Sequence, residues 1–177
     1  VVERRDRREA LPAGHVEIAS EASLISTGTE LKFYRGDFGG GDDDAPLDAT
    51  IASLKDATLG YPLDYGYSLS GIVVRAAAGV EPSLLGQRVF AFHPHASAAV
   101  AAADGVQRVP DGVGASDAVY LPALETALSI AHDAHVRPGE STLVVGQGLI
   151  GLLVTAVLAR AAPGADVVAV DPLGQRR

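Results

Sequence analysis

The stretch LVVGQGLIGLLVTAVLARAAPGADVVAVDP, residues 143–172, decides the fold of this chain. It reads as a short apolar run, a glycine-rich turn, a long apolar segment, a Pro-Gly stop and a second apolar run. Runs that are apolar along their whole length are typical of strands in parallel sheets that are covered on both faces. A strand, a helix and a second strand in this order make one βαβ unit. Because the chain ends five residues later, we expect a fragment that holds only the first such unit.

The turn within this stretch, GQGLIG, has the spacing G-x-G-x-x-G, with Gly146, Gly148 and Gly151 in place. The first glycine lets the chain leave the strand sharply, the second lets the backbone approach a pyrophosphate, and the third lets the helix pack closely on the sheet. The next helix begins at Leu149 and Ile150, whose backbone N–H groups and positive dipole end face the anion. The turn therefore predicts a dinucleotide-binding site.

An acidic residue, Asp171, ends the second apolar run twenty residues after Gly151. A carboxylate in this place accepts hydrogen bonds from ribose hydroxyls and repels a 2′-phosphate, so we expect NAD as the cofactor. Arg176 and Arg177 follow closely and weaken that preference, which leaves NADP as an alternative. Two further interpretations stay open, namely a tight turn without a ligand and a site for S-adenosylmethionine.

The composition excludes several classes of function. The chain has 14 Lys and Arg against 22 Asp and Glu, a net charge of −8, which gives no attractive field for nucleic acid or an anionic membrane. It has no cysteine, which excludes disulfides, thiolate nucleophiles and cysteine-ligated zinc. We expect a soluble protein of a reducing compartment, the cytoplasm or the plastid stroma. Its expected partner is a small-molecule substrate, and a homodimer of the full-length protein is compatible with the sequence.

The part of the chain before residue 110 has a different pattern. Short apolar runs broken by Gly, Pro and Asp predict the strands of an antiparallel, barrel-like domain, in HVEIASEASLIS, YSLSGIVVRAAA, QRVFAFHPH and SAAVAAADGVQRV. Residues 1–15 are expected to be a frayed end, and the acidic segment FGGGDDDAPL, residues 38–47, a solvated loop. Helical spacing of apolar residues over 119–134 predicts a connecting helix.

Several of these stretches together resemble the medium-chain dehydrogenase/reductase superfamily of zinc alcohol dehydrogenases and quinone reductases, and in particular its bacteriochlorophyllide a dehydrogenase-like branch. The stretches are ASLISTGTE, YPLDYGYSLSGIVV, GQRVFAFHPHAS, RVPDGV, LPALETAL and VVGQGLIGLL. The resemblance implies a GroES-like catalytic domain with its connecting helix over residues 16–135 and a partial Rossmann domain over 136–177. It also implies reversible hydride transfer between a secondary alcohol and a ketone, with a hydroxyethyl tetrapyrrole as a candidate substrate.

The chain departs from the zinc enzymes of this superfamily at two ligand segments. Residues 27–30 read Thr-Gly-Thr-Glu where the family has a cysteine ligand, and residues 66–68 read Gly-Tyr-Ser where it has Gly-His-Glu. Hydroxyl and phenol oxygens are not usual zinc ligands, so we expect no zinc. The resemblance makes Thr29 a candidate for proton relay. Tyr67 can bring a phenol to the same oxygen, or it is a packed aromatic in a turn.

The remaining candidates are a threonine and the histidines. By resemblance, Thr126 packs against the nicotinamide ring; an ordinary helix threonine is the alternative. In FHPH, His93 is our candidate for a catalytic, pocket-lining histidine and His95 a second one, with surface histidines of no role as the alternative. His132 and His135 are interpreted as capping a helix C-terminus. For the whole chain, a non-catalytic nucleotide-binding or interaction module is the alternative function, and the fragment by itself is expected to be inactive.

Overall fold

The computed structural model describes residues 10–36, 63–162 and 164–176. Two compact units make up the chain, Val1–Val119 and Tyr120–Arg177, and each is described by itself. Residues 1–9 of the predicted frayed end (1–15), the predicted acidic loop at 38–47 and Arg177 lie outside the described residues. At the other limit of that predicted end, His15 is part of a strand.

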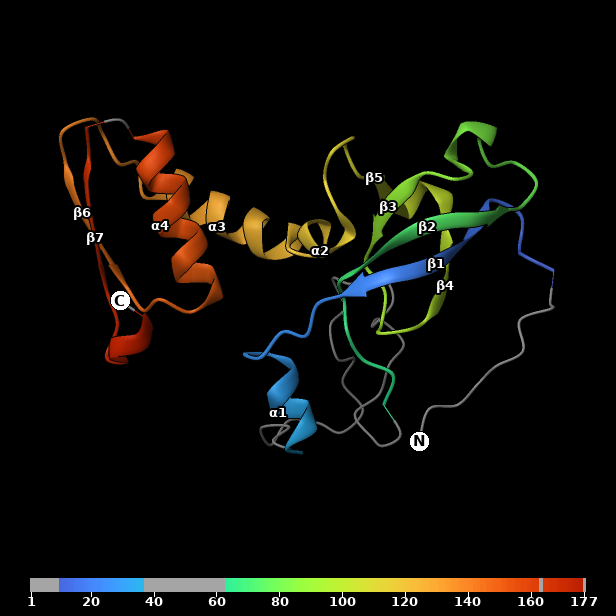
Figure 1. Ribbon diagram of the computed structural model, residues 1–177, viewed down its shortest axis with the longest axis horizontal. Helices are drawn as coiled ribbons and strands as arrows, with labels where there is room; N and C mark the ends of the chain where they lie inside the picture. The colour runs from blue at the N-terminus through green and yellow to red at the C-terminus, as the bar shows by residue number, and fades with distance from the viewer. Residues whose placement is uncertain (1–9, 37–62, 163, 177) are drawn as a thin grey trace. The chain divides into compact units, whose positions relative to one another are not determined.

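The first unit is built on a curled antiparallel sheet of five strands in the order β4-β1-β2-β3-β5 (Figure 1). The strands are β1 His15–Ser23, β2 Leu69–Ala76, β3 Arg88–Ala91, β4 Ala98–Ala102 and β5 Val106–Arg108. The predicted antiparallel strands are confirmed. The last predicted run forms two strands instead of one, because a 3₁₀ turn at Ala103–Gly105 separates β4 from β5.

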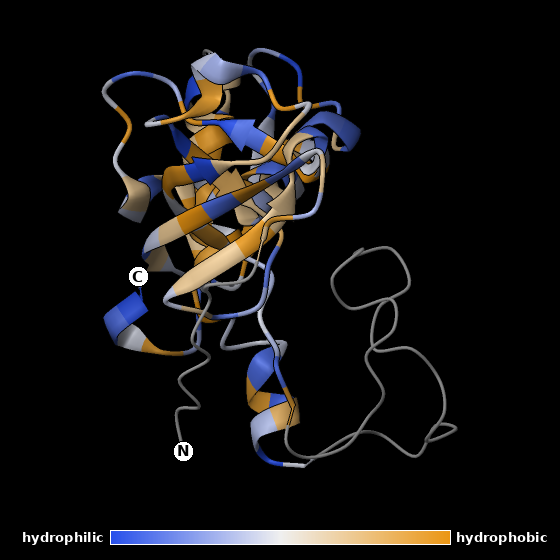
Figure 2. Cartoon of the chain, turned by 90° about the vertical axis from the view of Figure 1, so that its right-hand side faces the viewer, coloured by the Kyte–Doolittle hydropathy of each residue, from blue (hydrophilic) through white to orange (hydrophobic). Residues whose placement is uncertain are grey.

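The core of the first unit is formed by the side chains that these strands direct to one face of the sheet. Side chains point to opposite faces of a strand in turn, and on β1 this buries Val16 and Ile18 completely. Leu69 and Val73 on β2 and Val89 on β3 complete the same apolar layer. Figure 2 shows apolar and polar residues alternating along these ribbons.

Two irregularities bend the central pair of strands. The register between β1 and β2 shifts between Glu17 and Ile18 and again between Ser20 and Ala22, as at β-bulges. Gly71 lies in the bent region, where a Cβ atom would approach the Ala19 carbonyl oxygen to 2.1 Å. Residue 71 must therefore lack a side chain for the two strands to pair.

Two short helices accompany the sheet. α1 Glu30–Tyr34 follows β1, and α2 Ala115–Ala118 packs against β1, β2 and β3. The sequence pattern does not predict α1, because five residues are too few to show a helical period. The buried Ser68 hydroxyl, just before β2, donates to the carbonyl of Val119, the residue that follows α2. This hydrogen bond connects the start of β2 to the end of α2.

The second unit contains the predicted βαβ unit, preceded by the predicted helix. Its elements are α3 Leu121–Asp133, β6 Ser141–Val145, α4 Leu149–Ala161 and β7 Asp166–Val170, followed by a 3₁₀ turn at Gly174–Arg176. β6 and β7 pair in parallel. One face of this small sheet packs on α4, with Ala127 of α3 in the same cluster. None of the helices in the described ranges is long and apolar enough to cross a membrane.

Candidate functional site

The glycine turn after β6 has the backbone geometry that its spacing predicts for two of its three glycines. Gly146 has φ +92°, in the left-handed region that favours glycine. A Cβ atom at Gly151 would lie 1.8 Å from the Gly146 carbonyl oxygen. The protein's own backbone therefore requires glycine at positions 146 and 151.

The middle glycine is different. Gly148 has φ −75° and ψ −171°, an extended conformation that any residue adopts. A Cβ atom built there would meet nothing within 4 Å. Neither backbone strain nor internal packing explains glycine at this position. The open space lies at the N-terminus of α4, where Leu149 and Ile150 begin the helix and the first N–H groups have no partner within it. This arrangement fits the phosphates of a dinucleotide.

The carboxylate of Asp171 is buried and tied to the same turn. Its Oδ2 atom accepts the Gln147 N–H at 2.7 Å, and its Oδ1 atom accepts the Leu173 N–H at 2.7 Å. In addition, the Gly146 N–H donates to the Val170 carbonyl at 2.7 Å. Asp171 thus links the end of β7 to the turn after β6. A carboxylate has about four acceptor positions, so the ribose contact expected for Asp171 stays a prediction alongside this linking role.

Gln147 is a residue of this turn that the sequence pattern does not single out. Its side chain is buried in the turn; its amide nitrogen donates to the Gly146 carbonyl at 3.2 Å. The Thr155 hydroxyl of α4 lies 3.3 Å from the Gln147 Oε1 atom and 2.8 Å from the Gly151 carbonyl. Gln147 therefore connects the turn to the second turn of its helix. The motif leaves this position free, so its spacing gave no signal for the residue.

Thr126 lies on α3 with an exposed side chain. Its hydroxyl donates to the Pro122 carbonyl one turn earlier, at 3.0 Å. The expected contact between Thr126 and the nicotinamide ring stays a prediction.

In the first unit, the three predicted catalytic residues lie on three different segments. Thr29 is exposed at the N-cap of α1, and its side chain makes no cap hydrogen bond. Tyr67 is half-buried, just before β2. His93 follows β3, and its Nδ1 atom lies 2.8 Å from the Pro94 carbonyl oxygen.

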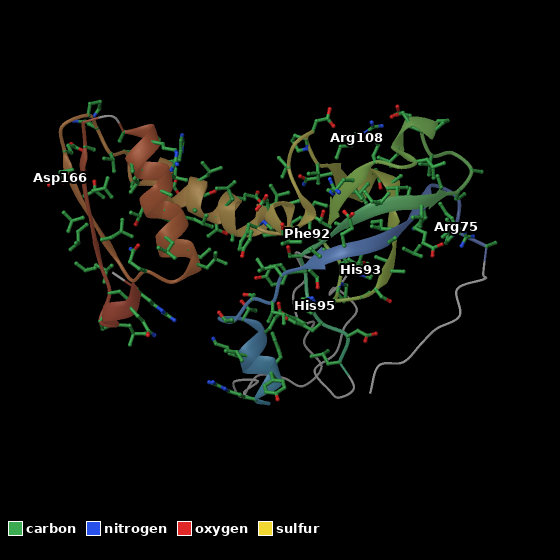
Figure 3. The ribbon with its side chains drawn as sticks, in the orientation of Figure 1. Arg75, Phe92, His93, His95, Arg108 and Asp166 are labelled. Atoms are coloured by element: carbon green, nitrogen blue, oxygen red, sulfur yellow. The ribbon has the colours of Figure 1, made fainter. Side chains whose placement is uncertain are left out.

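His95, the second histidine of the loop after β3 and labelled in Figure 3, is the one that joins these segments. Its Nε2 atom lies 2.7 Å from Glu30 Oε2, and its Nδ1 atom lies 3.0 Å from Ser23 Oγ. The imidazole is 29% exposed and the Glu30 side chain only 11%. The other carboxylate oxygen of Glu30 accepts the Ser26 N–H at 2.7 Å. We call Ser23, His95 and Glu30 the imidazole network.

The segment before β2 leaves space for this imidazole because residue 66 is a glycine. Gly66 has φ +122°, and a Cβ atom there would lie 2.7 Å from the His95 ring and 2.9 Å from its backbone nitrogen. The His95 N–H donates to the Tyr65 carbonyl at 3.1 Å. Thr29 is next to Glu30 in the chain, and Tyr67 is next to Gly66. The network therefore brings together the two segments that carry the predicted hydroxyl candidates.

The donors at the two segments where the resemblance places zinc ligands are not those that zinc usually selects. Thr27 and Tyr67 offer hydroxyl and phenol oxygens, which zinc does not usually select, and the Ser68 hydroxyl is committed to the Val119 carbonyl. Glu30 and His95 are ligand types, but they bond each other. Within residues 10–36, 63–162 and 164–176, no group of three or more His, Asp or Glu residues is arranged to hold a metal.

Comparison with known proteins places this geometry among oxidoreductases. No protein-family model matches the chain. D-guloside 3-dehydrogenase of Escherichia coli K12 is 27% identical over 99% of this chain and 52% of its own length. Quinone oxidoreductase-like protein 2 of Rattus norvegicus is 35% identical over 52% of this chain and 28% of its own. D-xylulose reductase A of Aspergillus oryzae is 38% identical over 38% of this chain and 19% of its own.

Solved structures share the fold. A short chain alcohol dehydrogenase from Escherichia coli CFT073, complexed with NADH, superposes with a TM-score of 0.71 at 21% identity, over 95% of this chain and 52% of that one. The 2R,3R-butanediol dehydrogenase of Bacillus subtilis gives a TM-score of 0.71 at 20% identity, over 96% and 59%. The Escherichia coli quinone oxidoreductase complexed with NADPH gives 0.65 at 19%, over 99% and 49%.

The D-xylulose reductase, the D-guloside 3-dehydrogenase and the Escherichia coli quinone oxidoreductase are medium-chain dehydrogenases and reductases. The chain has their fold, a GroES-like sheet domain followed by the beginning of a Rossmann domain, and the predicted fold class is confirmed. Nearly the whole chain aligns with D-guloside 3-dehydrogenase, but it spans only about half the length of that relative.

Proposed function

We propose that this chain belongs to an NAD(P)-dependent oxidoreductase, which interconverts a secondary alcohol and a ketone without zinc. The observation that carries the proposal is the open space at Gly148, where nothing in the protein itself requires glycine. A dinucleotide pyrophosphate needs this space, and the N-terminus of α4 supplies the N–H groups and the positive dipole end that an anion binds.

The glycine turn and Asp171 are proposed to hold the cofactor. Gly146 and Gly151 shape the turn, Gly148 leaves room for the pyrophosphate, and the N–H groups of Leu149 and Ile150 bind it. Asp171 lies at the end of β7, where its carboxylate favours ribose hydroxyls over a 2′-phosphate. NAD is therefore the proposed cofactor, with NADP as the alternative because Arg176 follows closely. When bound, the nicotinamide accepts or supplies a hydride.

The proposed catalytic residues of the first unit are Thr29, Tyr67 and His93. Removing a hydride from a secondary alcohol also requires a group that accepts the hydroxyl proton. Thr29 and Tyr67 carry the hydroxyls proposed to exchange that proton with the substrate oxygen, and His93 is proposed to line the substrate pocket. Zinc independence is supported by the oxygen donors at positions 27 and 67, which do not suit that metal.

Two substrate classes follow from different observations. The resemblance of the sequence to the bacteriochlorophyllide branch supports a hydroxyethyl tetrapyrrole. The names of the relatives, D-xylulose reductase and D-guloside 3-dehydrogenase, support a sugar or polyol. Both classes present a secondary alcohol that becomes a ketone, so the chemistry proposed for the site is the same.

The test is turnover by the protein expressed from its complete reading frame. NADH oxidation is followed with D-xylulose, acetophenone and an acetyl tetrapyrrole as probe ketones. We expect turnover with at least one ketone and a loss of about a hundredfold in kcat for Thr29→Val or Tyr67→Phe, a typical contribution of a proton-transfer group. Unchanged turnover in both variants would overturn the relay assignment. Binding of NADH without turnover of any ketone would favour a non-catalytic nucleotide-binding module instead.

A further inference from the structure

We propose that the imidazole network of Ser23, His95 and Glu30 is the acid–base group that stores the transferred proton. The inference rests on the proposed function, which requires a proton acceptor but assigns it only to hydroxyls. A threonine or tyrosine hydroxyl at neutral pH passes a proton on without keeping it, since its own pKa range lies far from neutral. An imidazole is the side chain that gains and loses a proton near neutrality.

The hydrogen bonds of the network fix how the imidazole is protonated. An ionised carboxylate only accepts hydrogen bonds, so Nε2, at 2.7 Å from Glu30 Oε2, carries the proton of the neutral ring. Nδ1 then accepts from the Ser23 hydroxyl at 3.0 Å. The lone pairs of Ser23 Oγ remain for an incoming proton, and Ser23 is exposed. Glu30 thus holds the ring in the state that receives a proton through Ser23.

The step balances in atoms and charges. During alcohol oxidation, the C–H bond of the carbinol carbon breaks and its electron pair leaves as a hydride to the oxidised nicotinamide, while the C–O bond becomes a C=O bond. The hydroxyl proton passes to Ser23 Oγ, directly or through Thr29 or Tyr67, and the Ser23 proton passes to His95 Nδ1. The resulting imidazolium is paired with the Glu30 carboxylate. Ketone reduction reverses each transfer.

The surroundings of the imidazole suit this role. Glu30 faces it from α1, the Ser23 hydroxyl from the end of β1, and the backbone of residues 65–66 from the segment before β2. His93 is the other titratable side chain of its loop. The Ser26 N–H bond to Glu30 fixes the carboxylate itself. A ring held from three segments, 29% exposed, can exchange its proton with solvent between turnovers.

The decisive variant is His95→Gln, because a glutamine amide can still donate to Glu30 and accept from Ser23 while it cannot titrate. In ketone reduction with NADH, we expect kcat of the parent protein to fall as the pH rises, because the step consumes a proton. We expect His95→Gln to lose about a hundredfold in kcat and to show no such pH dependence. The KM for NADH and the melting temperature should stay at the parent values.

Ser23→Ala should show the same flattened pH profile, because it removes the route to Nδ1. The matched control is His132→Gln, which removes a histidine that is 86% exposed on the second unit and should change neither kcat nor the pH profile. A parent-like pH profile in His95→Gln would overturn this inference and leave the proposed function standing. A parent protein that turns over none of the probe ketones would overturn both, so the two failures are distinguishable.

Discussion

At the scale of single residues, the three glycines of the turn occupy their positions for different structural reasons. Gly146 is needed for its positive φ, Gly151 for its closeness to the Gly146 carbonyl, and Gly148 for neither. The fold requires glycine at two of these positions, and at the third, the N-cap of α4, the open space supports the proposed cofactor. This difference leads to a paired test by mutation.

Gly148→Ala should keep the fold and weaken cofactor binding. The added methyl group meets nothing within 4 Å and costs under about 1 kcal/mol as a poorer N-cap. It would crowd the pyrophosphate and lower the affinity for NADH about tenfold, roughly 1.4 kcal/mol. Gly151→Ala should instead destabilise the second unit by about 1–3 kcal/mol, as overpacking does. Melting curves and NADH titrations of both variants check this pair, and equal melting temperatures would contradict it.

Asp171→Asn should loosen the turn as well as change the cofactor preference. Asparagine has one acceptor oxygen, so its amide group would point a donor at either the Gln147 or the Leu173 N–H. Losing one buried hydrogen bond in this way costs about 1–3 kcal/mol. Urea unfolding of the variant gives the value. If stability were unchanged while NADPH binding improved, Asp171 would be only a ribose ligand and the linking role would be wrong.

The sequence predicted the glycine turn because its residues lie within six positions and each has a physical reason for its place. It did not predict the imidazole network. Glu30 and His95 are 65 residues apart, and no spacing rule connects a helix start to a loop after another strand. The place of FHPH in the chain indicates a pocket-lining loop but does not distinguish His95 from His93. Nothing in the sequence indicates that the backbone at Gly66 leaves space for the His95 ring.

At the scale of elements, side-chain hydrogen bonds connect strands of the first unit's sheet in addition to the backbone hydrogen bonds. Arg88 on β3 reaches Glu21 on β1 with two hydrogen bonds, at 2.8 and 3.3 Å, and so spans β2 between them. The hydrogen bond from the Arg88 guanidinium lowers the pKa of the Glu21 carboxyl below its ordinary value of 4.5. Short apolar runs broken by Gly, Pro and Asp predicted the strands of this sheet, whereas the five residues of α1 are too few to show a helical period.

This lowered pKa predicts a pH-dependent stability. A carboxyl whose pKa is lower in the folded state stabilises the fold above its unfolded pKa and loses that effect as the pH falls through the folded one. Glu21→Gln should therefore lower the urea midpoint slightly at neutral pH and leave it unchanged in acid. The effect is small because both side chains are partly exposed. Glu81→Gln, in a more exposed pair with Arg108, is the control and should have no measurable effect.

At the scale of the whole molecule, the chain has one well-enclosed core and one half-covered sheet. The side of β6 and β7 that faces away from α4 exposes Leu143, Val145, Val168 and Val170, with Val145 75% exposed. Strands that read as apolar throughout predicted a sheet covered on both faces, and in the described residues only one face is covered. Contiguous exposed apolar surface of this kind drives association in water.

The 177-residue chain should therefore associate as its concentration rises, which sedimentation velocity measures directly. Replacing Leu143 and Val145 together by threonine keeps the strand shape of Val145 and should raise the monomer fraction. Val74→Thr, on an exposed apolar residue of β2, is the matched control and should leave association unchanged. A chain that stays monomeric at all concentrations would contradict the inference that this face is unprotected.

The central claim is that the glycine turn holds a dinucleotide, and the most direct measurement is a titration of the protein from its complete reading frame with NADH and then NADPH, followed by nicotinamide fluorescence. We predict saturable binding of NADH, tighter than that of NADPH, and weaker binding of both by Gly148→Ala, whose melting temperature should fall less than that of Gly151→Ala. Tighter NADPH binding would show that Arg176 and Arg177 outweigh Asp171. Binding of neither nucleotide by the folded protein would contradict the account, and S-adenosylmethionine would be the next ligand to titrate.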